Sequence, residues 1–520
     1  MPNYDNQRSQ YWYPLVIGLA AALGLLAGYN MNFENAKHSL FSFTEESSNT
    51  ISVNGDGRIE EILRFVETKY VDSIETDKIT LQLIDELLDQ LDPHSSYISP
   101  EELADHNERM KGEYRGIGIE TLTYQDTFYL TRLMETGPAK KAGLSVGDAI
   151  LSVNGQAVSG VEMPISEVRA MLKDSLNDAL EVEVLSLGNT LPKTVELASD
   201  IIEVPSADVC YMLDDEIAYL KLSRFSANTY EQFIEAIESI KKGKTKLSLV
   251  LDLRDNPGGY LPEAIKILSQ LFDSKDKLLT YTEGLNRKRR DYRSTGNAFY
   301  NIDKIAVLID GYSASGSEIL SGAVQDWDRG IVIGETSYGK GLVQEIFNLR
   351  NGGALRLTVA KYYTPSGRLI QRSYSSESNE FSADSSVHLT KVLEREMDSG
   401  NGIVPDRIVK ETNCYEYQYY FDQYLIETMK QQGTLDLVIT DFTEAAYRSF
   451  VKTQFEESFE NISPSCIAGF NKAAFLRYKQ MILTDTAYAK YANLSDKHVK
   501  VALDFINDKR ETLALLSEEE

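Results

Sequence analysis

Alternating strand and helix patterns between residues 201 and 409 constrain the fold of this chain more than any other feature. Short apolar runs such as 247–253 and 305–309 are typical of buried strands, and amphipathic runs such as 229–241 and 261–272 are typical of helices. Strands that alternate with helices form a largely buried sheet with helices on its faces. We therefore predict an α/β domain in this part of the chain.

A cluster of serines lies at one strand-to-helix turn of this domain. The strand 305–309 leads into residues 311–318, and the apolar face of a helix begins at Ile319. A serine on such a turn lies near the positive end of the helix dipole, where an oxygen can gain negative charge. Ser315 is therefore a candidate nucleophile. Ser315 with Glu318 three residues later also fits a capping box, and on that spacing alone a helix cap is the simpler interpretation.

A serine nucleophile needs a base, and no histidine lies near the strand ends expected to converge on the serine turn. Lys340 follows the next strand and is flanked by Gly339 and Gly341. A lysine acts as a base only when it is neutral, so its pKa must fall from ~10.4 to about 7–8, which burial can achieve. Gln344 would orient the Lys340 amine by a hydrogen bond. We expect His94, in a turn after a helix, to be structural.

Three segments together resemble the carboxy-terminal-processing (tail-specific) serine proteases. They are 251–259 (LDLRDNPGG), 313–318 (SASGSE) and 339–344 (GKGLVQ), and two further family segments match at 91–95 and 400–406. The resemblance covers about residues 58–410. It implies a multidomain α/β protein with a crotonase/ClpP-like peptidase core.

The resemblance also assigns roles to the candidate residues. The five scattered histidines suggest no metal cluster, and no cofactor is expected. Asp326 lies at a position that is acidic in some family members, so it either supports the site or is an ordinary exposed helix residue. This chain has glycine at 316 where alanine is usual in the family. The assigned residues are the nucleophile Ser315, the general base Lys340, its partner Gln344, and the oxyanion donors Gly316, Gly258 and Gly259.

Short strands and glycine turns between residues 111 and 197 resemble a PDZ domain. The resemblance is carried by the series Gly-Pro-Ala (137–139), Ala-Gly-Leu (142–144) and Val-Asn-Gly (153–155). It implies a groove that binds a peptide C-terminus as an added strand. The backbone amides at the terminal carboxylate would be those of Gly116, Ile117 and Gly118, because glycines allow close approach to an anion.

An apolar segment near the N-terminus indicates export. Residues 11–29 carry no charge and 14–28 are almost wholly apolar, which approaches the ~17–20 residues needed to cross a bilayer. We expect an uncleaved transmembrane anchor, with a cleaved secretory signal as the alternative. The net charge of −26 argues against a nucleic-acid partner, because phosphate binding needs a basic surface.

The C-terminal part of the chain shows amphipathic helix patterns and no recognisable chemistry. Its Cys414 and Cys466 could form a bridge in an exported protein, but we expect buried free thiols, as for Cys210. The expected organisation is an anchor or signal (1–32), a linker (33–57), an N-terminal helical region (58–110), the PDZ domain (111–197), the peptidase core (198–410) and a C-terminal helical extension (411–520).

These observations predict a serine endopeptidase that cleaves proteins near or from their C-termini after PDZ recognition of the tail. The expected location is the bacterial cell envelope, with an inner-membrane anchor and the catalytic region in the periplasm. Assembly as a homo-oligomer or with an adaptor stays open. The alternative is a membrane-tethered PDZ binding scaffold with an inactive core. The joint presence of Ser315, Lys340 and Gln344 argues against it, because a scaffold does not need that set.

Overall fold

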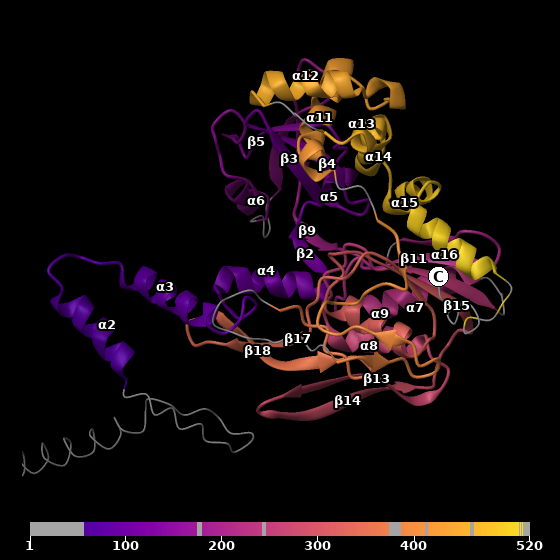
Figure 1. Ribbon diagram of the computed structural model, residues 1–520. Coiled ribbons are helices and arrows are strands. Elements are labelled where there is room, and N and C mark those ends of the chain that lie inside the picture. Colours follow the sequence, from indigo (N-terminus) through magenta and orange to yellow (C-terminus); the bar gives the residue numbers. More distant parts are fainter. Residues whose placement is uncertain are drawn as a thin grey trace, which may run out of the picture. The chain divides into compact units, whose positions relative to one another are not determined.

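The computed structural model describes residues 57–173, 179–207, 209–241, 246–373, 386–410, 414–457, 462–508, 510 and 512 (Figure 1). The chain divides into two compact units, residues 1–81 and 82–520. The predicted anchor 1–32 and all but the last residue of the predicted linker 33–57 lie outside the described residues. Within the described residues, no helix is both long enough and apolar enough to cross a membrane.

Two helices occupy the positions expected from the apolar periodicity before the predicted PDZ domain. They are α2 (Arg58–Lys69) and α3 (Thr76–Asp89). After α3 the chain turns at Asp92, whose Oδ1 accepts the backbone N–H groups of His94 at 2.9 Å and Ser95 at 3.0 Å. This turn leads into the short strand β1 (Ser96–Ile98) and then into α4 (Pro100–Lys111).

The predicted α/β domain is built on a six-stranded sheet in the order β10-β11-β12-β15-β16-β21. β10 is antiparallel to β11, and the remaining neighbours are parallel. Every residue of β12 is buried, as expected for a parallel strand that is covered on both faces. The strands are β10 (Val209–Met212), β11 (Ile217–Lys221), β12 (Leu247–Asp252), β15 (Ile302–Ile309), β16 (Ile331–Gly334) and β21 (Arg407–Ile408).

Helices cover the two faces of this sheet because alternate side chains of each strand point to opposite sides. One face, which includes Leu249 and Val307, packs on α7 (Thr229–Lys241), α8 (Leu261–Gln270) and α9 (Gly316–Asp326). The other face includes Val250 and Leu308, and it packs on the C-terminal helices α15 (Asp485–Asn493) and α16 (Lys497–Asn507). The C-terminal region therefore completes the core of the α/β domain.

A second, antiparallel sheet supports the segment that carries Gln344. Its order is β1-β18-β13-β14, and β17 also pairs with β18. β1 pairs with β18 so that Ser96 lies opposite Arg356, which brings the turn at Asp92 next to the β17–β18 hairpin. The remaining strands are β13 (Lys275–Gly284), β14 (Arg287–Thr295), β17 (Leu342–Asn348) and β18 (Ala354–Tyr363). A separate two-stranded sheet pairs β19 (His388–Leu389) with β20 (Glu396–Met397).

The predicted PDZ domain contains a sheet in the order β3-β4-β5-β7-β8, and β6 pairs with β5. Two helices, α5 (Pro138–Lys141) and α6 (Ile165–Lys173), pack with it, and β2 (Glu113–Gly116) pairs with β9 (Asp200–Glu203) at its base. The strands are β3 (Ile119–Tyr124), β4 (Thr127–Leu133), β5 (Ala149–Val153), β6 (Gln156–Ala157), β7 (Leu180–Leu185) and β8 (Lys193–Leu197).

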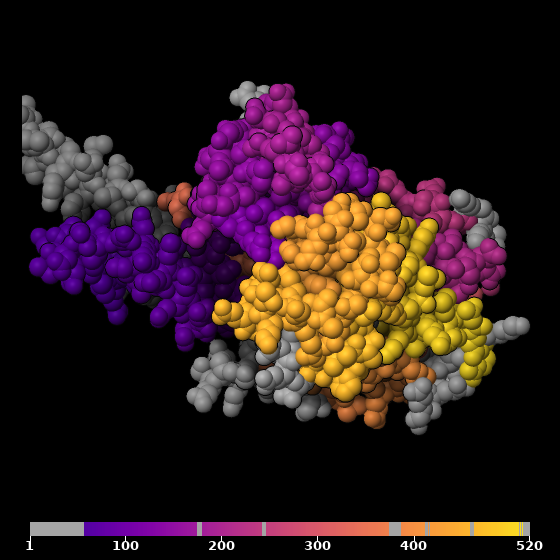
Figure 2. Space-filling model, turned by 90° about the horizontal axis from the view of Figure 1, so that it is seen from above, coloured from indigo at the N-terminus to yellow at the C-terminus, as the bar shows by residue number. Residues whose placement is uncertain are grey.

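The C-terminal helices form an aromatic core that also includes one face of the predicted PDZ sheet. Tyr124, Tyr129 and Ala149 of that sheet belong to the same buried cluster as Tyr424 and Phe470. Figure 2 shows the orange atoms of this region lying against the purple atoms of the β-domain. The helices before α15 are α10 (Tyr415–Gln418), α11 (Phe421–Gln432), α12 (Glu444–Phe455), α13 (Pro464–Ala468) and α14 (Phe470–Ile482), with the short 3₁₀ helix η1 (Ile439–Asp441) between α11 and α12.

The expectation of free thiols at Cys414 and Cys466 is wrong, because the two residues form a disulfide. The bridge joins the start of α10 to α13 across 52 residues. Sequence spacing could not settle this pairing, because it depends on how the C-terminal helices pack. Cys210 remains a free cysteine, and burial raises the pKa of its thiol to about 12.

Candidate active site

Ser315 lies at the predicted strand-to-helix turn, between β15 and α9. It has φ 54° and ψ −110°, a strained conformation for a residue with a side chain. Its side chain makes no capping hydrogen bond to the described helix, whereas its backbone N–H donates to Glu318 Oε2 at 2.8 Å. Only the Glu318 half of the expected capping box is therefore present, and the Ser315 hydroxyl does not serve as the helix cap.

The two neighbouring serines, Ser313 and Ser317, support the turn. The Ser313 hydroxyl donates to the Leu253 carbonyl at 2.8 Å, and the Ser317 hydroxyl donates to the Asn256 carbonyl at 2.9 Å. Both side chains are fully buried. They attach the serine turn to the loop that follows β12.

Lys340 is held by the partner that the sequence suggested. The Lys340 amine donates to Gln344 Oε1 at 2.9 Å, and Gln344 Nε2 donates to the His94 carbonyl at 2.7 Å. Burial, together with the charge of Arg356 on β18, lowers the pKa of the Lys340 amine, against the opposing effect of Glu318 and Asp92. A lowered pKa favours the neutral amine that a general base requires.

A buried carboxyl group joins the serine turn to the lysine turn. Glu318 is completely buried, and its Oε2 accepts the backbone N–H groups of both Ser315 and Lys340, at 2.8 Å and 2.9 Å. Its Oε1 accepts the Gly339 N–H at 2.7 Å and the Ser337 hydroxyl at 2.5 Å. Burial raises the pKa of Glu318 to about 7 in spite of these four donors.

Tyr362 of β18 makes a second connection between the two turns. Its hydroxyl donates to the Lys340 carbonyl and lies 3.2 Å from the Ser315 carbonyl. The side chain is buried, and burial raises its pKa well above the usual value, so the phenol stays protonated as a donor. The backbones of Ser315 and Lys340 therefore form one rigid assembly, although no hydrogen bond joins their side chains in the described chain.

The glycine turn 257–259 packs directly against Ser315. A side chain at Gly258 would place its Cβ 2.7 Å from the Ser315 Cβ and 2.9 Å from the Gly316 nitrogen, and Gly258 has φ +94°. The Gly258 N–H donates to Asn256 Oδ1 at 2.9 Å, so it is occupied within the protein. Among the described hydrogen bonds, none uses the N–H groups of Gly316 or Gly259. These two amides fit an oxyanion donor better than that of Gly258.

A cleft of ≈ 470 Å³ opens where these turns meet. The expectation that no histidine lies near this site is wrong, because His94 lies in the cleft with Lys340. Burial and the nearby Lys340 charge lower the pKa of His94, which favours its neutral form. The cleft is lined by His94, Asp255, Pro257, Tyr312, Ala314, Tyr338 and Lys340.

Asp326 lies at the end of α9 and is fully buried, so its interpretation as an exposed helix residue is wrong. Its Oδ1 accepts Arg368 Nη2 at 2.6 Å, and its Oδ2 accepts the Ser366 N–H at 2.7 Å. Arg368 is itself only 1% exposed. The described contacts of Asp326 hold the segment after β18 and do not reach Ser315 or Lys340.

A hollow of ≈ 320 Å³ lies between β3 and α6 of the predicted PDZ domain. Within the described sheet, β3 pairs only with β4, so its other edge is available for an added strand. Apolar side chains of Ile119, Ile165 and Val168 line the hollow, and Glu120 and Arg169 are charged residues beside them. The groove therefore has a partly apolar lining beside the unpaired edge of β3.

The three residues expected to bind the peptide carboxylate, Gly116, Ile117 and Gly118, lie directly before β3, which borders this groove. Gly116 ends β2, opposite Asp200, and Gly118, with φ +78°, precedes β3. The carbonyls of Ile117 and Gly118 accept the N–H groups of Ala139 and Met134, each at 2.9 Å. Carboxylate binding by the amides of these three residues stays a prediction. In the described residues, no cluster of histidine, cysteine and acidic side chains is arranged to hold a metal ion.

Sequence reasoning missed the roles of Glu318 and Tyr362 in joining the two turns. Glu318 was recognised only as the last residue of a capping box, because its other partners lie 19 to 22 residues further along the chain. Nothing in the sequence around Tyr362 pointed to the site. Its burial beside Ser315 and Lys340 arises from pairing of β17 with β18.

Two family models and several known proteins are similar to this chain. A model of peptidase family S41 matches residues 216–375, and a PDZ domain model matches residues 105–185. A carboxy-terminal-processing protease of Bartonella bacilliformis is 36% identical over 317 residues, covering 60% of this chain and 72% of that protein. A carboxyl-terminal-processing protease of Synechocystis sp. is 32% identical over 295 residues, covering 55% of this chain and 67% of that protein. Among solved structures, a photosystem II D1 C-terminal processing protease is 26% identical with a TM-score of 0.37, covering 68% of this chain and 92% of that one.

Proposed function

Because this chain belongs to the carboxy-terminal-processing proteases of peptidase family S41, we propose that it is a serine endopeptidase with a Ser315–Lys340 dyad. The observation that carries this proposal is the hydrogen bond of the half-buried Lys340 amine to Gln344, beside the turn that bears Ser315. Buried lysines with a lowered pKa are suited to act as bases. In the proposed reaction, the enzyme cuts substrate proteins near their C-termini.

In the first step, the Ser315 oxygen attacks the scissile carbonyl while the neutral Lys340 amine takes the serine proton. The carbonyl carbon becomes tetrahedral, and its oxygen gains the negative charge. Lys340 then gives its proton to the leaving amine as the peptide bond breaks, which leaves an acyl-enzyme. Water attacks the acyl-enzyme with Lys340 again acting as the base, and this releases the new C-terminus and restores Ser315.

Gln344 is proposed to orient the base. Its side-chain oxygen accepts one N–H of the amine, so the nitrogen lone pair remains for the serine proton. Its own amide is anchored on the His94 carbonyl, which fixes its rotamer. The dyad side chains must approach further in the substrate complex, because catalytic hydrogen bonds often form fully only with substrate bound.

The oxyanion is proposed to accept hydrogen bonds from the Gly316 and Gly259 amides. The Gly316 N–H lies at the start of α9, where the helix dipole also favours negative charge. Gly258 contributes through its lack of a side chain, because any Cβ at this position would collide with Ser315. Removal of one oxyanion donor in serine proteases costs about 10²–10³ in kcat, so the geometry of this turn matters.

The PDZ domain is proposed to select substrates by their C-terminal tails. A tail would pair with the edge of β3 and place apolar side chains against α6. We also propose that the protein acts in the bacterial cell envelope, with residues 1–32 as its inner-membrane anchor and the peptidase in the periplasm. The disulfide between Cys414 and Cys466 supports an oxidising compartment.

A cleavage assay on the full-length protein tests this proposal. The substrate is a folded protein with an apolar C-terminal tail, and the variants are Ser315→Ala and Lys340→Ala. We expect both to lose cleavage by at least 10³-fold while tail binding stays unchanged, as estimated from the loss of a nucleophile or base. Cleavage by Lys340→Ala at a rate near that of the native protein would rule out its role as the base. Tail binding without any cleavage by the native protein would instead favour the scaffold alternative.

A further inference from the structure

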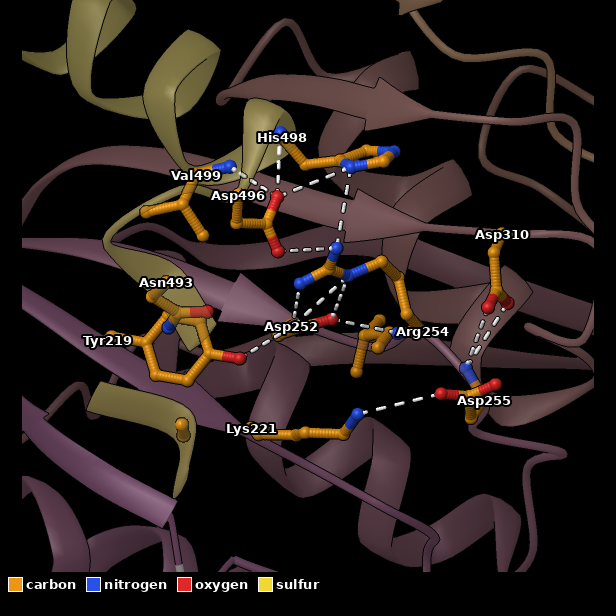
Figure 3. Close-up of polar contacts among 12 residues, drawn as sticks. Tyr219, Lys221, Asp252, Arg254, Asp255, Asp310, Asn493, Asp496, His498 and Val499 are labelled. Carbon is orange, nitrogen blue, oxygen red and sulfur yellow. Dashed lines mark hydrogen bonds and ion pairs between the residues drawn. The ribbon is translucent and has the colours of Figure 1, made fainter. Parts of the chain in front are cut away.

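A buried ionic network ties the end of β12 to the C-terminal helices (Figure 3). Arg254 lies between two carboxylates: its Nη2 donates to Asp252 Oδ2 at 2.6 Å, and its Nη1 donates to Asp496 Oδ2 at 2.8 Å. Asp252 is completely buried and also accepts the Tyr219 hydroxyl at 2.6 Å. The guanidinium is therefore held from two sides, by Asp252 at the end of β12 and by Asp496, a residue more than 240 positions later in the chain.

Asp496 has a second set of partners that fixes its position. Its Oδ1 accepts the backbone N–H groups of His498 at 2.8 Å and Val499 at 3.2 Å, so it is the N-cap of α16. α16 is in turn docked on the central sheet through Val499 and Phe505. The carboxylate that holds Arg254 is thus placed by a helix packed on the sheet.

Arg254 belongs to the loop that carries the glycine turn of the proposed oxyanion site. The Leu253 carbonyl accepts the Ser313 hydroxyl at 2.8 Å, and the Asn256 carbonyl accepts the Ala314 N–H at 3.0 Å. Gly258, two residues after Asn256, packs against Ser315. Any displacement of this loop therefore moves the glycine turn relative to the nucleophile.

From these contacts we infer that Asp496 is a positioning residue for catalysis, acting through Arg254 on the loop 253–259. The C-terminal helical region is then part of the catalytic unit and more than an appended domain. The inference rests on the proposed peptidase function for its effect on turnover. Loss of the Asp496 charge removes the ion pair on one side of a nearly buried guanidinium, where only the longer contact of Nη1 with His498 Nδ1 at 3.4 Å remains, and so loosens the loop. Misplacement by about 1 Å can cost ~10²-fold in rate.

Full-length Asp496→Asn tests the inference, because asparagine is as good an N-cap as aspartate but carries no charge. We expect kcat per folded molecule to fall more than fivefold, with KM and tail affinity unchanged. A smaller fall in kcat overturns the inference. The matched control is Asp485→Asn, which breaks another ion pair of the C-terminal region, to Arg132 of β4. The control should keep its kcat within twofold, and an equal loss in both variants also overturns the inference.

A double-mutant cycle distinguishes positioning through Arg254 from a general loss of stability. If Asp496 acts through Arg254, the variant Asp496→Asn with Arg254→Lys is no slower than Arg254→Lys alone. If each substitution lowers kcat by the same factor in the double variant as it does alone, the two effects are independent and the inference is contradicted. Thermal unfolding of each variant confirms that kcat is compared between folded proteins.

Amide hydrogen exchange provides a readout that needs no activity. The N–H of Asn256 donates to the Leu253 carbonyl at 3.2 Å and that of Ala314 to the Asn256 carbonyl at 3.0 Å, so both report on the loop. We expect exchange at these amides to be more than fivefold faster in Asp496→Asn and unchanged in Asp485→Asn. Equal exchange in both variants and the native protein overturns the inference. If the native protein cleaved no substrate, the proposed function would fail, while the exchange data would still decide the role of Asp496.

Discussion

Glu318 Oε2 lies 2.9 Å from the backbone nitrogen of Lys340 and accepts its hydrogen bond. The same oxygen accepts the backbone N–H of Ser315 at 2.8 Å. One buried carboxyl group therefore sets the distance between the turn of the proposed nucleophile and the turn of the proposed base. The arrangement requires no direct contact of Glu318 with substrate, and it makes the site sensitive to the protonation and shape of this side chain.

Glu318→Gln should lower both activity and stability. A glutamine offers one acceptor oxygen where the native carboxyl group offers two, and its NH₂ group would face N–H or O–H donors. A buried donor left without its acceptor costs about 1–3 kcal/mol. At pH 5, below the raised pKa of Glu318, we expect the free energy of unfolding to fall by about that amount. We expect kcat to fall by at least 10-fold, on the same energy scale. Denaturant unfolding and steady-state kinetics measure the two effects, and a variant with native values for both would contradict the linking role of Glu318.

The stability difference between the native protein and Glu318→Gln should also depend on pH. Burial raises the pKa of Glu318 from 4.5 to about 7, so the folded protein takes up a proton that the unfolded chain has already lost in this range. The stability that the folded protein gains from binding this proton is fully present below about pH 4.5 and is lost as the pH rises through about 7. The native protein should therefore lose up to about 3 kcal/mol relative to the variant over this interval. A difference that stays constant between pH 5 and pH 8 would show that Glu318 ionises normally.

Arg356→Gln should shift the pH dependence of cleavage to higher pH. The Arg356 charge helps burial to lower the pKa of Lys340, so its removal raises that pKa and leaves less neutral amine at pH 7. We expect kcat/KM to fall at pH 7 and to recover at alkaline pH, where Lys340 again loses its proton. Lys361→Gln is a matched control, because it removes another cation of β18, whereas Arg356 is the cation whose charge lowers the Lys340 pKa. An unchanged pH profile in Arg356→Gln would mean that Lys340 is not the titrating base.

Ile165→Asp should weaken recognition of substrate tails. Ile165 lines the hollow between β3 and α6, and a carboxylate there would face an apolar peptide side chain. We expect the Kd for an apolar C-terminal peptide to rise at least tenfold, which corresponds to about 1.4 kcal/mol. Ala170→Asp adds the same charge to an exposed position of α6 outside the hollow and should leave the Kd unchanged. Peptide titration by fluorescence anisotropy compares the two variants. Equal affinities would show that the tail does not bind in this groove.

Removal of the disulfide should destabilise the C-terminal region. The bridge closes a loop with a sequence separation of 52 residues, and the chain-entropy model gives about 4 kcal/mol for a loop of this length. We expect the double variant Cys414→Ala/Cys466→Ala to unfold at lower denaturant concentration, with the C-terminal helices losing hydrogen-exchange protection first. The same midpoint for the variant and the oxidised native protein would show that the bridge adds no stability.

Local patterns were sufficient to predict the elements of the core. The apolar run 247–253 became β12, and the run 305–309 became the C-terminal part of β15, because central strands covered on both faces have few alternatives. The lysine and its glutamine partner could also be predicted, since they lie four residues apart on one turn and strand. Local patterns did not predict that His94 lies at the site, because its carbonyl accepts a hydrogen bond from Gln344, which is 250 residues away in the sequence. They also failed for Asp326, whose burial depends on an arginine 42 residues away.

The sequence by itself determined the alternation of strands and helices, the resemblance to a serine peptidase family, and the PDZ domain that precedes the core. These properties follow from periodicity and from short motifs, in which the interacting residues are close in the chain. Only the tertiary structure decided that Glu318 joins the turns of Ser315 and Lys340, and that Asp496 holds Arg254 from the C-terminal region. Both arrangements depend on buried polar groups that need hydrogen-bond or ion-pair partners. Those partners come from distant parts of the sequence, so no local pattern predicts them.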